Sequence, residues 1–215
     1  MKVDIIFNKP NTVGLLRILL LILGIFSEKY VFLALYTVSA SLDALDGKLA
    51  RKYNECTVLG SCLDMITDRS STILIITKIV ENAAYSKNFR LYFTKRTWQG
   101  FSKFLSTVLI VDILSHFMYF SFALINKQQH KTPKNWLLSL YYNKNILLFL
   151  CTTVEIFYVF LYFLIAFDVR IIGLYKNLLY FLVICCIVKS FFHIVQLYVA
   201  LDGLSYVENP TMKIK

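Results

Sequence analysis

Asp43-Ala-Leu-Asp-Gly-Lys-Leu-Ala-Arg51 and Gly60-Ser-Cys-Leu-Asp-Met-Ile-Thr-Asp68 place four aspartates within otherwise apolar sequence. A charged side chain near the centre of a bilayer costs about 2.5–3.5 kcal/mol, so such residues indicate a functional site. At helical spacing, Asp43 and Asp46 share one helix face, and Asp64 and Asp68 lie one turn apart on a second helix. Two acidic faces on consecutive helices can meet and form one carboxylate cluster.

The composition is that of a membrane protein. The chain has 215 residues, of which 58% are hydrophobic and 17% charged, whereas soluble domains are about 45–50% apolar and about 25% charged. The net charge of +10 comes from basic residues in short segments between apolar runs. That distribution indicates membrane topology and contact with lipid headgroups, so we expect no nucleic-acid partner. Cys56 and Cys62 lack a second Cys or His group that would complete a zinc site.

The apolar runs predict an all-α integral membrane six-helix bundle, formed as a single domain by residues 1–215. About 20 apolar residues span a bilayer. A short amphipathic segment, Met1 to Pro10, precedes the first span, and Pro10-Asn11-Thr12 supplies the proline and capping residue of that helix. The polar segments 82–103 and 126–145 are expected to be loops. The six expected spans are about 13–26, 31–52, 57–80, 104–125, 146–167 and 171–201.

Six spans place both termini on one side of the membrane. The positive-inside rule then places the termini, the turn between the second and third helices and the 127–144 segment in the cytosol. The 87–103 segment falls on the opposite side and is just as basic, so charge alone does not decide the orientation.

The carboxylate cluster has the chemistry of a metal site. Four facing carboxylates repel one another unless a cation neutralises them. Donor sets made of oxygen alone select hard ions such as Mg²⁺ or Mn²⁺, and two such ions about 4 Å apart assist phosphoryl displacement. Gly47 and Ala50 leave room beside the helix, and Arg51 carries a guanidinium matched to phosphate. The residues therefore predict a metal-dependent site for a phosphate-bearing substrate at one membrane face.

The spacing Asp43-x2-Asp46-Gly47-x2-Ala50-Arg51-x8-Gly60-x3-Asp64-x3-Asp68 resembles the signature of the CDP-alcohol phosphatidyltransferase family. This resemblance implies a six-helix membrane fold, usually a homodimer, that moves a phosphatidyl group from a CDP-linked lipid to an alcohol. Carried over residue by residue, it implies that two Mg²⁺ or Mn²⁺ ions are bound by Asp43, Asp46, Asp64 and Asp68. Asp68 would also be the base for the acceptor hydroxyl. The CDP part of the donor would contact Gly47, Arg51 and Thr57.

The acceptor is suggested by tracts outside the signature, which are similar to those of the eukaryotic phosphatidylinositol synthases in this family. That similarity implies CDP-diacylglycerol and myo-inositol as substrates and CMP as the second product. It also implies a protein embedded in the lipids of the endoplasmic reticulum membrane, with its active site facing the cytosol. Segment 82–103 departs from the resemblance, being longer and more basic than expected. The tracts are Pro10-Asn11 with Gly14 and Arg17, Leu63 to Thr72, Asp112-Ile-Leu-Ser115-His116, Tyr141-Tyr142, and Glu155-Ile-Phe-Tyr158.

Two other functions remain open from the sequence. A relative could use another acceptor, such as glycerol phosphate, serine or inositol phosphate. A divalent-cation transporter could use the aspartates as a transit site, but transporters are typically built from repeats and interrupted helices. The three prolines all lie outside the expected spans, and no repeat is present.

Several polar residues within the expected spans have alternative roles. Asp112 and His116 have the i, i+4 spacing of a satisfied intramembrane pair. Arg17 and Arg69 would either bind inositol hydroxyls or support the aspartates. His193, on the expected sixth helix, is interpreted as a packing residue.

Overall fold

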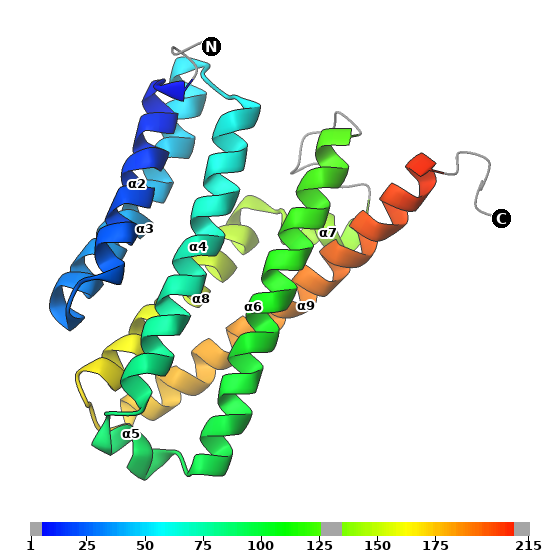
Figure 1. Cartoon of the computed structure of the whole chain (residues 1–215). Coiled ribbons are helices and arrows are strands. Elements are labelled where there is room, and N and C mark those ends of the chain that lie inside the picture. The colour runs from blue at the N-terminus through cyan, green and yellow to red at the C-terminus, as the bar shows by residue number, and fades with distance from the viewer. Residues whose placement is uncertain (1–5, 126–134, 209–215) are drawn as a thin grey trace. The chain divides into compact units, whose positions relative to one another are not determined.

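The computed structural model describes residues 6–125 and 135–208, with side chains as far as residue 206. Within these ranges it is helical and contains no β-strand, which confirms the expected all-α class (Figure 1). Residues 1–5 of the expected amphipathic segment lie outside the described part. The helices are α2 (Lys9–Ile25), α3 (Lys29–Tyr53), α4 (Val58–Ala83), α5 (Lys87–Tyr92), α6 (Lys95–Ile125), α7 (Trp136–Tyr141), α8 (Lys144–Ala166) and α9 (Leu174–Glu208).

Three of the described helices, α6, α8 and α9, are long and apolar enough to cross a membrane by length and composition. Helix α2 has only 17 residues, and α3 and α4 carry the aspartates together with several basic residues. The expectation of six spans therefore remains a prediction for these first three helices.

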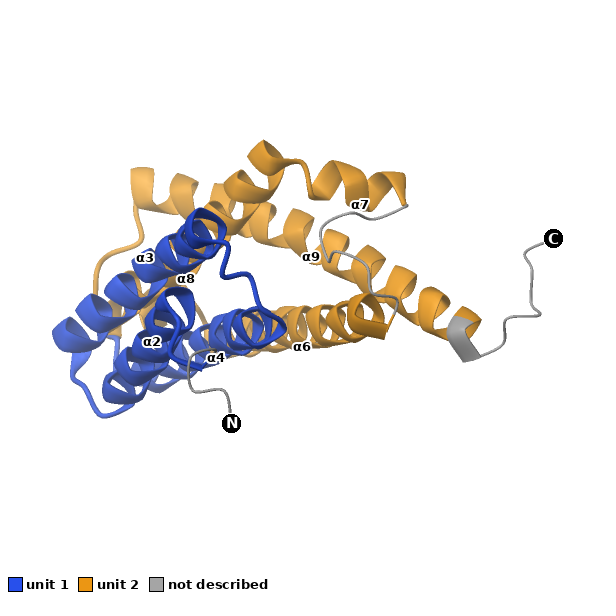
Figure 2. Cartoon of the chain, turned by 90° about the horizontal axis from the view of Figure 1, so that it is seen from above, with its two compact units in different colours: residues 1–86 blue, residues 87–215 orange. Residues whose placement is uncertain are grey.

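The chain divides into two compact units, residues 1–86 and 87–215 (Figure 2). In the first unit, α2 packs against both α3 and α4. Helices α2 and α4 are in contact at Gly14, where an added Cβ atom would lie at an ordinary van der Waals distance, 3.9 Å, from Cβ of Leu63 on α4. The first unit thereby brings the two acidic helices against one common neighbour.

Expected boundaries were wrong in three places. Helix α2 begins at Lys9 and not after Pro10, because Asn8 is its N-cap and accepts a hydrogen bond from the Asn11 amide at 2.9 Å. Proline is tolerated in the first turn, where its missing N–H has no helical partner. Segment 82–103 is not a loop: it contains α5 and the first turns of α6. Segment 126–145 was also expected to be a loop, but its described part contains α7 and the start of α8.

In the second unit, α9 packs against α6, α7 and α8. One buried cluster between α6, α7 and α9 consists of Tyr119, Leu138 and Ala200. Gly203 leaves room for the ring of Phe122 between α9 and α6, since a Cβ atom there would overlap the ring in its present position. Long apolar helices thus form a tightly packed core in this unit.

Candidate active site

A short turn joins the two acidic helices. Asn54 ends α3 in the left-handed conformation, with φ of 54°, and the Glu55 amide donates to the Ala50 carbonyl at 2.9 Å. Thr57 is the N-cap of α4, and its hydroxyl accepts a hydrogen bond from the Gly60 amide at 3.0 Å. The carboxylate of Glu55 accepts from the Lys9 amide at 3.0 Å, which ties the turn to the start of α2.

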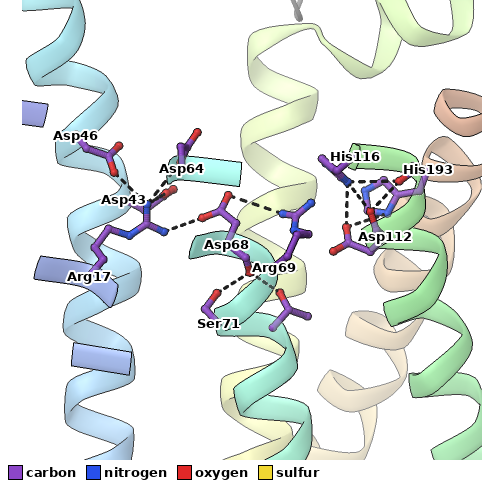
Figure 3. A network of polar contacts seen from close by, with 12 residues as sticks. Arg17, Asp43, Asp46, Asp64, Asp68, Arg69, Ser71, Asp112, His116 and His193 are labelled. Carbon is purple, nitrogen blue, oxygen red and sulfur yellow. Dashed lines mark hydrogen bonds and ion pairs between the residues drawn. The ribbon is translucent and has the colours of Figure 1, made fainter. Parts of the chain in front are cut away.

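Arg17 of α2 contacts all four signature aspartates (Figure 3). Its side chain is only 2% exposed. The Nη1 atom lies 2.6 Å from Oδ1 of Asp43, 3.0 Å from Oδ2 of Asp46 and 3.5 Å from Oδ1 of Asp64. The Nη2 atom lies 2.6 Å from Oδ1 of Asp68. The guanidinium is therefore the centre of a five-residue charge cluster.

The aspartates differ in exposure. The side chain of Asp46 is 12% exposed and that of Asp68 33%, whereas Asp43 and Asp64 are 44% and 54% exposed. Asp43, Asp64 and Asp68 each offer a carboxylate oxygen within 4.8 Å of the other two. Asp46 joins them through Arg17. Half-exposed carboxylates that surround a single buried cation still carry excess negative charge, which favours binding of further cations from solvent.

The donor set fits hard divalent ions. It consists of carboxylate oxygens from two helices, which is the ligand type that Mg²⁺ and Mn²⁺ prefer. Asp43 and Asp46 come from α3, and Asp64 and Asp68 from α4. Because neighbouring carboxylates repel one another, the cluster gains stability from added positive charge. The residues present therefore match a divalent-metal site.

The residues predicted to contact the CDP moiety lie near the ends of α3 and α4. A Cβ atom added at Gly47 would lie 3.6 Å from Nη1 and 3.7 Å from Nη2 of Arg51. The Arg51 guanidinium thus lies along the side of α3 that Gly47 leaves open. Thr57 is the N-cap of α4, and its hydroxyl lies beside Gly60.

Gly60 has a packing role that the sequence alone did not assign. A Cβ atom there would lie 2.8 Å from the amide oxygen of Asn11 and 3.2 Å from Oγ1 of Thr57. Asn11 is 2% exposed. Glycine at this position therefore permits α4 to approach α2, which places the α4 aspartates within reach of Arg17.

With this geometry in place, comparisons with known proteins identify the family. A family model described as CDP-alcohol phosphatidyltransferase matches residues 7–168, well over half of the chain. The chain belongs to this family. The match begins before α2 and extends past the end of α8, so it includes both acidic helices and much of the second unit.

Curated relatives show to which members of the family the chain is similar. The chain is 31% identical to the CDP-diacylglycerol–inositol 3-phosphatidyltransferase of Drosophila melanogaster over 206 residues, covering 93% of this chain and 85% of the fly protein. It is 36% identical to the Saccharomyces cerevisiae protein of that name over 161 residues, covering 71% and 66% of the two chains. Identity to the Homo sapiens protein of that name is 27% over 208 residues, covering 91% and 90%. No solved structure gives a significant match.

Sequence reasoning left open the role of Arg17 and assigned His193 to packing. The structure shows that Arg17 supports the aspartates. It also brings His193 to Asp112, with Nδ1 and Oδ1 3.2 Å apart, and confirms the Asp112–His116 pair at 3.4 Å. One signal could have predicted both contacts. An ionisable residue in an apolar helix needs a partner, and the apolar helices contain few carboxylates with which Arg17 or His193 could pair.

Proposed function

We propose that this protein is a phosphatidylinositol synthase, which transfers the phosphatidyl group of CDP-diacylglycerol to myo-inositol and releases CMP. The observation that carries the proposal is the convergence of the four signature aspartates on Arg17, in a chain that aligns over most of its length with relatives of this activity. The relatives that name inositol come from insects, fungi, plants and mammals.

In the reaction, an inositol hydroxyl oxygen attacks the phosphorus of the phosphatidyl group. The bond from that phosphorus to the oxygen of CMP breaks, and CMP leaves with the bonding electrons. We assign Asp68 as the base that receives the hydroxyl proton. Its Oδ1 is held by Arg17 Nη2 at 2.6 Å, whereas Oδ2 has a looser contact with Arg69 Nη2 at 3.7 Å, so Oδ2 is the oxygen suited to accept the proton.

Asp43, Asp46, Asp64 and Asp68 would hold two divalent ions, either Mg²⁺ or Mn²⁺. When bound, these ions supply positive charge that stabilises the diphosphate as negative charge develops on CMP. Arg17 orients the four carboxylates, because its buried guanidinium on α2 contacts each of them. Gly47, Arg51 and Thr57 would bind the cytidine and phosphate groups of the donor.

The membrane setting completes the proposal. Helices α2, α3 and α4 would join α6, α8 and α9 as spans, which gives six and puts both termini on the same side of the membrane. The family resemblance assigns that membrane to the endoplasmic reticulum and that side to the cytosol. The acidic helices then meet at the cytosolic face, where CDP-diacylglycerol and inositol are both accessible. The family resemblance supports a homodimer in lipid.

The test is an acceptor panel with purified protein in liposomes that contain CDP-diacylglycerol and Mn²⁺ or Mg²⁺. Labelled myo-inositol, serine, glycerol 3-phosphate and inositol phosphate would be supplied separately, and the lipid products separated. We expect label in lipid from myo-inositol alone, with release of an equal amount of CMP. Labelling from another acceptor and not from inositol would refute the inositol assignment while keeping the family. Uptake of Mn²⁺ into the liposomes without any lipid product would indicate a transporter instead.

A further inference from the structure

A second group of potential metal ligands lies within the second unit. Asp112 and His116 on α6 and His193 on α9 each offer a ligand atom within 4.8 Å of the other two (Figure 3). Asp112 and His193 are buried, at 6% and 3% exposure, and the His116 side chain is 18% exposed. Placing a carboxylate and two imidazoles inside an apolar core is costly, so the cluster calls for a role beyond packing.

The separations suit ligands of one small ion. Bonds of about 2.0–2.1 Å from an ion to nitrogen or oxygen put two tetrahedral ligands about 3.3–3.4 Å apart. Nδ1 of His193 lies 3.2 Å from Oδ1 of Asp112. The two imidazole rings have centroids 4.8 Å apart and are nearly perpendicular, at 85°.

The hydrogen bonding of His116 prepares it as a ligand. Its Nδ1 lies 2.9 Å from the main-chain carbonyl oxygen of Asp112, one turn earlier on α6. A carbonyl oxygen can only accept a hydrogen bond, so in this contact Nδ1 carries the hydrogen and the lone pair is on Nε2. Histidine ligands in metal proteins typically have their second nitrogen fixed in this way by a carbonyl or carboxylate oxygen. The hydroxyl of Ser115 donates to the same carbonyl at 3.0 Å, which reinforces the arrangement.

The donor atoms distinguish this cluster from the aspartate site of the first unit. Two imidazole nitrogens and one carboxylate oxygen favour borderline transition metals, above all Zn²⁺, over Mg²⁺. We propose that Asp112, His116 and His193 bind one divalent transition-metal ion of the zinc class, which links α6 to α9. Its ligands are separate from the signature aspartates, so metal binding at the two groups can be tested separately.

Metal content is the direct test. The full-length protein, carrying a tag without histidine, would be loaded with Zn²⁺, dialysed against excess Mg²⁺ so that the aspartate site holds Mg²⁺, and analysed for bound metal. We expect about one zinc per chain in the natural protein, and loss of nearly all of it in Asp112→Asn and His193→Ala. Asp64→Asn, in the first unit, and His130→Ala, the third histidine of the chain, are the matched controls and retain zinc.

Spectroscopy of the natural protein removes any dependence on whether the variants fold. The X-ray absorption fine structure of bound zinc is expected to show imidazole nitrogens at about 2.0–2.1 Å, and Co²⁺ in place of zinc gives the visible bands of a low-symmetry nitrogen and oxygen site. Natural protein that retains no zinc overturns the proposal and leaves the cluster as three polar side chains in mutual contact. Zinc that is kept by His193→Ala but lost by Asp64→Asn assigns the metal to the aspartates and overturns it equally.

Discussion

Replacing Arg17 with glutamine removes the one guanidinium that contacts all four signature aspartates. Breaking a buried ion pair costs about 3–5 kcal/mol, because the remaining charge is left without compensation, whereas exposed pairs contribute about 0–1 kcal/mol. Only Asp46 is well buried, and the other three side chains are a third or more exposed. We therefore expect a loss of about 3 kcal/mol in the absence of metal, close to the lower bound for a buried pair.

This loss is measurable as a thermal shift. For a chain of 150–250 residues, 1 kcal/mol corresponds to about 2–4 °C, so Arg17→Gln in detergent with EDTA is expected to unfold about 6–12 °C below the natural protein. Added Mn²⁺ should restore most of the difference. An ion that binds the folded state alone stabilises it by about 2.7 kcal/mol at a hundred times its Kd, and in the variant it no longer shares the carboxylates with Arg17.

The matched control is Lys78→Gln on α4. Lys78 pairs with Glu81 at 3.4 Å, but the Glu81 side chain is 55% exposed, so we expect a shift below about 2 °C with or without Mn²⁺. The measurement is intrinsic fluorescence during heating, at a fixed scan rate for all variants. The assigned role of Arg17 would be refuted if Arg17→Gln and the natural protein unfolded at the same temperature in EDTA. It would also be refuted if Mn²⁺ raised the unfolding temperature of the variant no more than that of the natural protein.

Three further substitutions test other parts of the structure. Asp68→Asn is expected to reduce the rate of lipid synthesis by about 10²–10⁴-fold, because the base is lost, with little change in CDP-diacylglycerol affinity; near-normal turnover would remove Asp68 from that role. Gly60→Ala places a Cβ atom 2.8 Å from an α2 amide oxygen, so we expect about 1–3 kcal/mol of destabilisation and reduced Mn²⁺ binding, checked by calorimetry. Gly203→Ala overlaps Phe122 and should lower thermal stability by a similar amount, whereas Gly100→Ala, with nothing within 4 Å, should not.

Helix positions followed closely from apolar runs, because burial and lipid exposure both select the same residues. The expected fifth span, 146–167, corresponds to α8, which covers Lys144–Ala166. Helix α6 was placed nine residues too late, since hydropathy marks the apolar part of a helix and not its polar extension. A capping signal was present: the Thr97 amide donates to Oγ1 of Thr94 at 3.3 Å, and threonine is a favoured N-cap residue.

The acidic residues of the candidate site could be predicted from the sequence, but the contact of Arg17 with them could not. The aspartates share two helix faces through spacing alone, which periodicity reveals. The contact between Arg17 and Asp68 joins residues 51 positions apart and depends on how α2 packs against α4. Glycine at position 60 is part of that packing, and its effect appears only when the neighbouring Asn11 is in place. Tertiary contacts of this kind leave no periodic trace in the sequence.

Charge balance explains why one arginine stands among four aspartates. When all are ionised, the four carboxylates exceed the Arg17 guanidinium by three negative charges, or by two when Arg69, 3.7 Å from Asp68, is counted as well. Arg17 therefore offsets enough repulsion for α3 and α4 to remain together without metal, yet leaves the site anionic enough to attract divalent cations. Asp43 and Asp64 are the most exposed of the four and contact the same Nη1 atom, so cations from solvent meet these two carboxylates first. Arg17 contacts Asp68 through Nη2 and the other three aspartates through Nη1, so Asp68 is held separately from the two most exposed carboxylates.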